Sequence, residues 1–245
     1  MNILLIAGHG DGDCGAVGSG YQEAELTREL VKLINSELSN YANVTVFDTS
    51  KNMYKYIKSG KAFNFKEYKY VLEVHFNACV KDTKGDGKTT GTEILVHTSE
   101  NGVSVENAIL MNVCDIGFRN RGVKTRSDLQ NMNVCKRVQG VSYALIETCF
   151  IDDLDDMKLY QANKEKVAKA IVKGIATGFS LKKVEDNNMS KFTDVPNNHW
   201  AYKAINELAE LGIVNGYQDG TFKPDKAVTR AELATILDRY FSLKN

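Results

Sequence analysis

Strand-like and helix-like segments alternate along the first 180 residues of the chain. Runs of strand length, rich in aliphatic, β-branched and aromatic residues, are separated by segments with an apolar residue at every third or fourth position. Such alternation is typical of α/β domains, so we expect an α/β fold with a twisted, mostly parallel sheet and helices on both faces. The expected strands are residues 2–7, 44–48, 70–77, 93–98 and 142–150, and the expected helices cover 26–38, 104–118 and 164–179.

The last fifty residues differ in composition from the rest. Both prolines, Pro196 and Pro224, lie there, and the polar stretch 182–188 that precedes them is typical of a linker. Two helical patterns follow: one ends at Gly212, and the other begins with a Thr-x-x-Glu capping box at Thr229. The predicted parts are a domain over residues 1–180, a linker over 181–190, and a small all-α module over 191–245 whose last helix covers 230–243.

Charge and hydropathy exclude several classes of protein. The chain has 31 Lys and Arg against 31 Asp and Glu, which argues against a nucleic-acid binder. It has no run of about 18 apolar residues, so we expect no membrane insertion. The first residues lack the basic start and the apolar run of roughly 7–15 residues of a secretory signal. We therefore expect a protein made in the cytoplasm without a signal peptide, with its five scattered cysteines reduced.

Polar side chains occur where the expected strands end, which is where α/β sheets bind ligands. His9 follows the first strand in a glycine-rich loop that lacks the pattern of a phosphate-binding loop. On a later strand, alternation places Glu73, His75 and Asn77 on one side. Taken singly, a histidine such as His75 is more often a hydrogen-bonded core residue than a ligand, and the glycine loop could be a simple connection.

Glu147 is a lone carboxylate within the apolar strand pattern 142–150. Burial raises the pKa of a carboxyl that is neither paired nor bound to a cation. A carboxyl of that kind is suited to accepting and returning a proton near neutral pH. The structural alternative is a buried salt bridge, but no basic residue adjoins Glu147 in the sequence.

Two histidines and one carboxylate form a typical catalytic zinc site, which keeps a fourth position open. His9 and His75 could supply the two imidazoles. Either Glu23 or Glu25 could supply the carboxylate, because both lie at the start of the helix that follows the glycine loop, where the helix dipole favours negative charge.

Four segments of the chain, in this order, resemble the zinc-dependent N-acetylmuramoyl-L-alanine amidases of type 3. The resemblance extends over nearly all of residues 1–180, and its segments are 7–23, 73–78, 120–124 and 144–150. It implies that His9, Glu23 and His75 bind one Zn²⁺ and that Glu147 is the catalytic glutamate. The family's helix opens with Glu, two variable residues and an apolar residue, which favours Glu23, and Glu25 stays an alternative.

The resemblance also implies a substrate and a reaction. The substrate is peptidoglycan, and the bond cleaved is the amide between N-acetylmuramic acid and the L-alanine of the stem peptide. In this reaction zinc activates the amide and the water, and Glu147 accepts a proton from water and passes it to the leaving amine. Asn77, and Arg121 within a turn formed by residues 120–122, are implied to contact the substrate.

The C-terminal segment closely resembles one S-layer homology repeat, through Phe-Thr-Asp-Val-Pro at 192–196, His-Trp-Ala at 199–201 and the motifs up to residue 232. The resemblance implies binding to secondary cell-wall polysaccharide, with Trp200 stacking on sugar and Arg230 pairing a carboxylate. Trp200 as a core residue and Arg230 as a plain helix start are the alternatives. The family usually has three repeats, so this chain either forms a homo-oligomer through its module or gains by avidity.

Both resemblances indicate the Gram-positive cell wall. With no export signal expected, we interpret the chain as a phage endolysin that acts at the wall after release from the cell. The competing interpretations are a cell-wall-binding protein with little or no activity and a zinc peptidase that cuts within the stem peptide.

Overall fold

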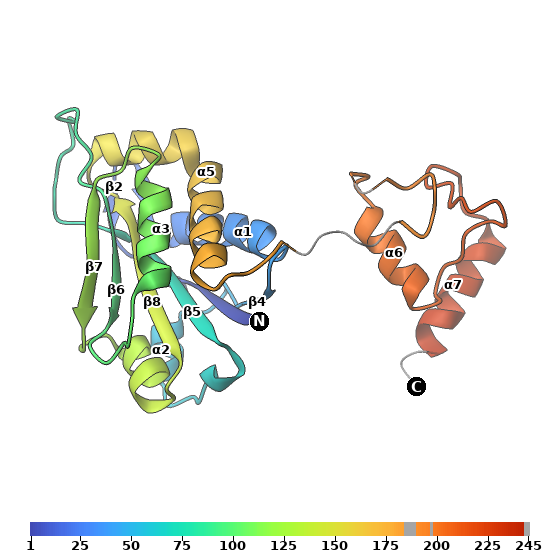
Figure 1. Cartoon of the computed structure of the whole chain (residues 1–245), viewed down its shortest axis with the longest axis horizontal. Coiled ribbons are helices and arrows are strands. Elements are labelled where there is room, and N and C mark those ends of the chain that lie inside the picture. The colour runs from blue at the N-terminus through green and yellow to red at the C-terminus, as the bar shows by residue number, and fades with distance from the viewer. Residues whose placement is uncertain (184–189, 197, 243–245) are drawn as a thin grey trace. The chain divides into compact units, whose positions relative to one another are not determined.

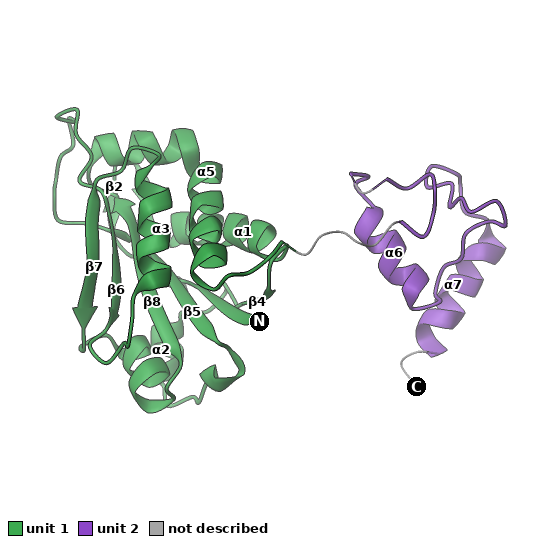
Figure 2. Cartoon of the chain, viewed as in Figure 1, with its two compact units in different colours: residues 1–183 green, residues 184–245 purple. Residues whose placement is uncertain are grey.

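The computed structural model describes residues 1–183, 190–196 and 198–242. Contacts within the chain divide it into two compact units, residues 1–183 and 184–245 (Figure 2). The predicted linker, 181–190, falls mostly on residues outside the described ones, as does position 243 at the end of the predicted last helix. None of the described helices has both the length and the apolar character needed to cross a bilayer.

The N-terminal unit is built on a six-stranded sheet with the strand order β4-β1-β5-β8-β6-β7 (Figure 1). Every neighbouring pair is parallel except β6 with β8, so β6 and β7 run opposite to the other four strands. The expectation of a mostly parallel sheet is confirmed. The strands are β1 (Asn2–Ala7), β4 (Asn43–Val46), β5 (Tyr70–Asn77), β6 (Thr92–His97), β7 (Asn120–Arg126) and β8 (Ser142–Phe150), and β2 (Val17–Gly18) and β3 (Tyr21–Gln22) form a separate hairpin.

Helices cover both faces of this sheet, and each face has its own cluster of buried apolar side chains. On one face α1, α3 and α5 pack on side chains such as Ile3, Leu72 and Ile146. On the other face α2 and a short helical segment before β8 pack on Leu4, Val71 and neighbouring side chains. The helices are α1 (Glu23–Leu38), α2 (Met53–Lys58), a 3₁₀ turn (Phe65–Glu67), α3 (Ser104–Cys114), α4 (Gln130–Met132) with a following π-helical turn (Asn133–Val138), and α5 (Leu154–Gly178).

Three expectations about the N-terminal unit were wrong. The helix expected over 104–118 ends at Cys114. Residues 120–122 form no turn, because they begin the edge strand β7. The predicted helix 164–179 begins ten residues earlier, at Leu154, where the Asp153 carboxylate accepts the free backbone N–H groups of the first helical turn. The apolar periodicity that marks a helix is clear only in the later part of α5, so the sequence pattern alone missed its start.

The C-terminal unit contains two helices, α6 (Tyr202–Glu210) and α7 (Arg230–Ser242). Its hydrophobic core is formed by side chains of α6 and of the flanking loops, among them Phe192, Val195 and Ile205. The capping box is confirmed: the Thr229 N–H donates to Glu232 Oε2 at 2.7 Å, and the Glu232 N–H donates to Thr229 Oγ1 at 3.2 Å. None of the residues of α7 is buried.

Candidate metal centre and active site

The loop that carries His9 has a fixed backbone conformation. His9 has φ of 61° and Gly10 has φ of 89°, both in the left-handed region. The guanidinium of Arg28 on α1 donates to the carbonyl of Gly8 at 3.1 Å and to that of His9 at 3.0 Å. A Cβ on Gly10 would lie 1.8 Å from Arg28 Nη2, so only glycine fits against this guanidinium. The glycine-rich loop is therefore held in a single shape by α1.

His9, Glu23 and His75 meet at the ends of β1, α1 and β5. Glu23 Oε2 lies 3.0 Å from His9 Nε2, and Glu23 Oε1 lies 2.9 Å from His75 Nδ1. One ligand atom from each residue lies within 4.8 Å of the others, so the three could hold one metal ion. Glu25 is exposed and takes no part in this cluster. The structure thus brings together Glu23, and not Glu25, with the two histidines.

Each histidine has a second carboxylate on its other ring nitrogen. Asp13 Oδ2 lies 3.0 Å from His9 Nδ1, and Glu73 Oε1 lies 3.0 Å from His75 Nε2. Asn131 donates to both oxygens of Glu73, at 3.2 and 3.1 Å. Carboxylates in this position orient the imidazole of metal-binding histidines and fix its tautomer. Asp13 was not predicted from the sequence, and Glu73 was recognised only as sharing a side of its strand.

The charges of the cluster shift the pKa values of its members. Burial would raise the pKa of Glu23, but hydrogen bonds from His75 and His9 hold it well below its ordinary value. Burial would lower the pKa of His75, but hydrogen bonds to Glu23 and Glu73 raise it well above 6.5. The pKa of His9 is also raised, by its hydrogen bonds to Glu23 and Asp13. In the metal-free chain, these carboxylates therefore favour the protonated form of both histidines.

Glu147 lies beside this cluster. It is the register partner of His75 on the adjacent parallel strand, so both side chains point to the same face of the sheet. Its Oε2 atom is buried and has no hydrogen-bond partner among the described residues. Burial raises the pKa of Glu147 to about 7, and the nearby charge of His75 opposes that rise. No ion pair to the Glu147 carboxyl occurs within residues 1–183, 190–196 and 198–242, so the buried salt bridge considered from the sequence does not form there.

Asn77 and Arg121, the two residues predicted to contact substrate, both form hydrogen bonds with Glu93. Asn77 Nδ2 donates to Glu93 Oε1 at 3.3 Å, and Arg121 Nε donates to Glu93 Oε2 at 2.6 Å. Lys124 Nζ donates to the same Oε2 at 2.6 Å. Glu93 is the register partner of Glu147 on β6. Sequence reasoning missed Glu93, although it is a lone carboxylate in an apolar strand pattern, as Glu147 is.

A cavity of about 310 Å³ opens beside the histidines. His9 and His75 line it together with their partners Asp13 and Glu73, and Leu129 to Asn131 close one side. The polar cluster is therefore reachable by a ligand on the same side of the sheet to which Glu147 points.

The model of the N-acetylmuramoyl-L-alanine amidase family matches residues 3–177. The chain belongs to this family. Among curated relatives of the amidase domain, "Probable autolysin PH" of Staphylococcus aureus is 29% identical over 192 residues, which cover 71% of this chain and 38% of the relative. The N-acetylmuramoyl-L-alanine amidase CwlM of Bacillus licheniformis is 27% identical over 191 residues, which cover 75% of this chain and 70% of CwlM.

Solved amidase structures share the fold of the N-terminal unit. The catalytic domain of CwlV, an N-acetylmuramoyl-L-alanine amidase from Bacillus (Paenibacillus) polymyxa, superposes with a TM-score of 0.60 and is 19% identical. The match covers 74% of this chain and 100% of the CwlV domain. At this identity the likeness concerns the fold, and it confirms the expected α/β architecture.

The second unit of this amidase-family chain matches the S-layer homology domain over residues 191–234. A cellulosome-anchoring protein of Acetivibrio thermocellus is 44% identical over 54 residues, which cover 22% of this chain and 12% of that protein. The chain thus spans less than half the length of the first curated relatives that it matches.

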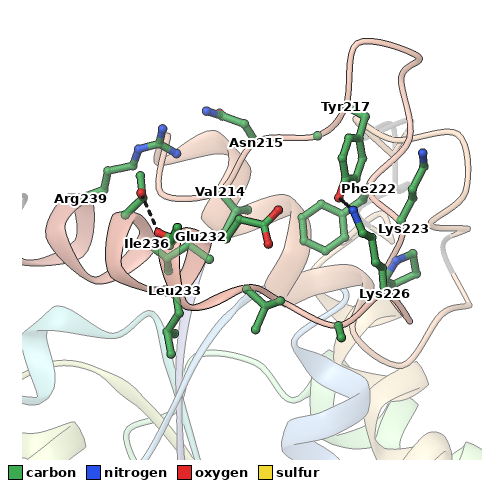
Figure 3. Close-up of a pocket in the computed structure, with 16 residues that line it drawn as sticks. Val214, Asn215, Tyr217, Phe222, Lys223, Lys226, Glu232, Leu233, Ile236 and Arg239 are labelled. Carbon is green, nitrogen blue, oxygen red and sulfur yellow. Dashed lines mark hydrogen bonds between the residues drawn. The ribbon is translucent and has the colours of Figure 1, made fainter.

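Both residues proposed for polysaccharide binding lie on the surface of this unit. Trp200 is 91% exposed and its ring stacks on His199 with centroids 5.8 Å apart, so Trp200 is not a core residue. Arg230 is exposed at the start of α7. The same unit has a pocket of about 700 Å³. Leu233 and Ile236 of α7 and Phe222 are among the residues that line it (Figure 3).

Proposed function

We propose that the N-terminal unit hydrolyses the amide between N-acetylmuramic acid and L-alanine in peptidoglycan, and that it does so with zinc. The observation that carries this proposal is the meeting of His9, Glu23 and His75 beside an unpaired, buried Glu147. Family membership supplies the class of substrate, and the donor set supports the metal.

The residues present fit zinc. Two imidazole nitrogens and one carboxylate leave a fourth position open, as catalytic zinc sites do. His9 Nε2 and His75 Nδ1 face Glu23, while their other nitrogens bond Asp13 and Glu73. This pattern directs one nitrogen of each ring toward a metal. When bound, zinc supplies Lewis-acid chemistry, which polarises a carbonyl and lowers the pKa of water.

Glu147 moves the proton in the proposed reaction. In the metal-free chain burial raises the pKa of its carboxyl to about 7, which suits a group that accepts and donates a proton near neutrality. It accepts a proton from the attacking water and then delivers it to the nitrogen of L-alanine. Without that proton the nitrogen would have to leave as an amide anion, which is a very poor leaving group. The cavity beside the cluster leaves room for the substrate amide.

Product analysis tests this function against its two alternatives. The full chain, loaded with zinc, is incubated with purified Gram-positive wall fragments, and the products are identified by mass spectrometry. We expect a free lactyl carboxylate on muramic acid. Shortened peptides on intact muramoyl-alanine would instead identify a peptidase, and unchanged fragments would identify a wall-binding protein without activity.

Metal analysis tests the zinc site separately. We expect about one zinc per chain in the unmodified protein and loss of that zinc in His75→Ala. A chelator should abolish hydrolysis, and added zinc should restore it. The His199→Ala variant, which changes a histidine of the other unit, should keep its zinc. Activity that is indifferent to chelators would overturn the proposal of a zinc enzyme.

We also propose that the C-terminal unit binds secondary cell-wall polysaccharide through Trp200 and Arg230, and that the module associates with further copies. Apolar side chains of α7 are exposed, with Leu233 at 47% and Phe241 at 60%, and a second copy would cover them. Light scattering of the full chain tests this. We expect an oligomer that Leu233→Asp dissociates, whereas a monomer at all concentrations would leave avidity on the wall as the mode of binding.

The finer proposal is a phage lysis enzyme that is made in the cytoplasm and released to the wall. Residues 2–7 form the strand β1 between β4 and β5, so they are part of the folded amidase domain. Expression in a Gram-positive host tests it. We expect lysis only when a membrane-permeabilising protein is co-expressed, and lysis without one would contradict the proposal.

A further inference from the structure

A β-bulge in the edge strand β7 turns two cations toward the candidate active site. Thr92 pairs with Asn120 and Ile94 pairs with Val123, so two residues of β7, Arg121 and Gly122, lie opposite Glu93 alone. Gly122 has φ of 83°, a conformation that glycine adopts without strain.

The bulge changes which side chains share a face. In a regular strand, residues three positions apart point to opposite faces. Here Arg121 and Lys124 both bond the same oxygen of Glu93, each at 2.6 Å. Both cations therefore point to the face of the sheet that carries Glu147, the register partner of Glu93.

Among the described residues, Arg121 and Lys124 share a single ion-pair partner. One carboxylate, Glu93, is the ion-pair partner of both, and Arg121 uses only its Nε for that bond. Within the described parts of the chain, the two terminal guanidinium nitrogens of Arg121 form no hydrogen bond. The guanidinium carbon lies 4.8 Å from the centre of the Phe150 ring, a cation–π contact. The side chains of Arg121 and Lys124 are 27% and 44% exposed.

A guanidinium with two free terminal nitrogens, beside an ammonium, is suited to a carboxylate, which it can bind through two parallel hydrogen bonds. On the other side of the site the carboxylates Glu23, Glu73 and Asp13 are bonded to the two histidines. An anionic group of the substrate is therefore favoured on the β7 side.

We propose that Arg121 and Lys124, held by Glu93, form a subsite for a carboxylate of the stem peptide close to the scissile amide. This inference rests on the proposed amidase function and adds a specificity to it. The enzyme distinguishes a free acid from its amide at the peptide residue that follows alanine.

Binding to a non-hydrolysing enzyme tests the subsite. The zinc-loaded full chain with Glu147→Gln is titrated calorimetrically with two muramoyl dipeptides. The two differ only in whether the α-carboxyl group of the second residue is a free acid or a primary amide. We expect about tenfold or more tighter binding of the acid, as charge-assisted hydrogen bonds provide.

Added substitutions locate the preference. Arg121→Gln and Lys124→Gln should each weaken binding of the acid and leave binding of the amide nearly unchanged. The ratio of the two dissociation constants, amide to acid, should then approach one. Arg119→Gln removes an exposed cation just before the same strand, and it should keep the ratio. Lys124 is the more exposed of the pair, so its variant is informative even if Arg121→Gln unfolds.

Equal affinity for acid and amide, or a variant that weakens both by the same factor, would overturn the subsite and leave these cations a structural role. The same two compounds are also given to the enzyme with Glu147 intact. If neither is cleaved, the proposed amidase function fails, while the binding ratio still decides the subsite.

Discussion

His75 and Glu147 lie directly opposite each other on the parallel strands β5 and β8. His75 is held on both ring nitrogens by carboxylates, Glu23 at 2.9 Å and Glu73 at 3.0 Å. Glu147 keeps a buried oxygen with no partner among the described residues. Strand pairing thus places a carboxyl that is free to exchange a proton next to a histidine that is not free to move.

The Glu147→Gln variant should lose activity and keep its metal. Glutamine has nearly the same shape but cannot accept a proton, so we expect turnover to fall by roughly 10²–10⁴, the usual contribution of general acid–base catalysis. The rate of product formation and the zinc content are measured on the same preparation. Glu25→Gln, which changes an exposed glutamate, should be as active as the unmodified chain. A Glu147→Gln enzyme with most of its activity would refute the assignment.

Zinc affinity should rise with pH. The pKa values of His9 and His75 in the metal-free chain lie above 6.5, so protons occupy these nitrogens at and somewhat above that pH. Zinc must displace those protons, and its affinity therefore falls as pH decreases through the raised pKa values. Calorimetric titration in two buffers of different ionisation heat counts the protons released, and we expect up to about two. An affinity that is constant between pH 6 and 8 would contradict this prediction.

Arg28→Lys should weaken zinc binding although it preserves charge. The guanidinium of Arg28 bonds the carbonyls of Gly8, His9 and Thr49 from one planar group, which a single ammonium cannot reproduce. Loss of these bonds frees the loop of His9, so we expect a decrease in zinc affinity of about tenfold, as for other groups that support ligands. A competing chelating dye measures it. Arg126→Lys, at an exposed ion pair with Asp128, serves as the control and should bind zinc normally.

Substitutions on the surface of the C-terminal unit should reduce attachment to cell walls. Trp200 is 91% exposed, and loss of its ring in Trp200→Ala removes a stacking surface without opening a cavity in the core. We expect the affinity for purified walls, measured by co-sedimentation, to decrease about tenfold, and we expect a similar effect for Arg230→Gln. Lys203→Gln, on an exposed side of α6, should sediment as the unmodified chain does. Undiminished sedimentation of both variants would place the polysaccharide elsewhere.

Much of the candidate site could be predicted from the sequence, because its residues follow local rules. Alternation along a strand placed His75 on the same side as Glu73 and Asn77, and an isolated carboxylate in an apolar run marked Glu147. The capping box at Thr229 and Glu232 needs only four consecutive residues, and it formed as expected. The choice between Glu23 and Glu25 stayed open at that stage, because both begin the same helix and only packing against β5 buries one of them.

The sequence by itself determined the two units' families, the α/β class and the residues able to bind a metal, since periodicity and motifs are properties of neighbouring residues. Tertiary structure decided what those residues touch. Strand order put Glu93 opposite Glu147, and the reversed direction of β6 and β7 came from pairings that no local pattern encodes. The bulge at Gly122 turned Arg121 and Lys124 to one face, because register is fixed only when two distant strands pair.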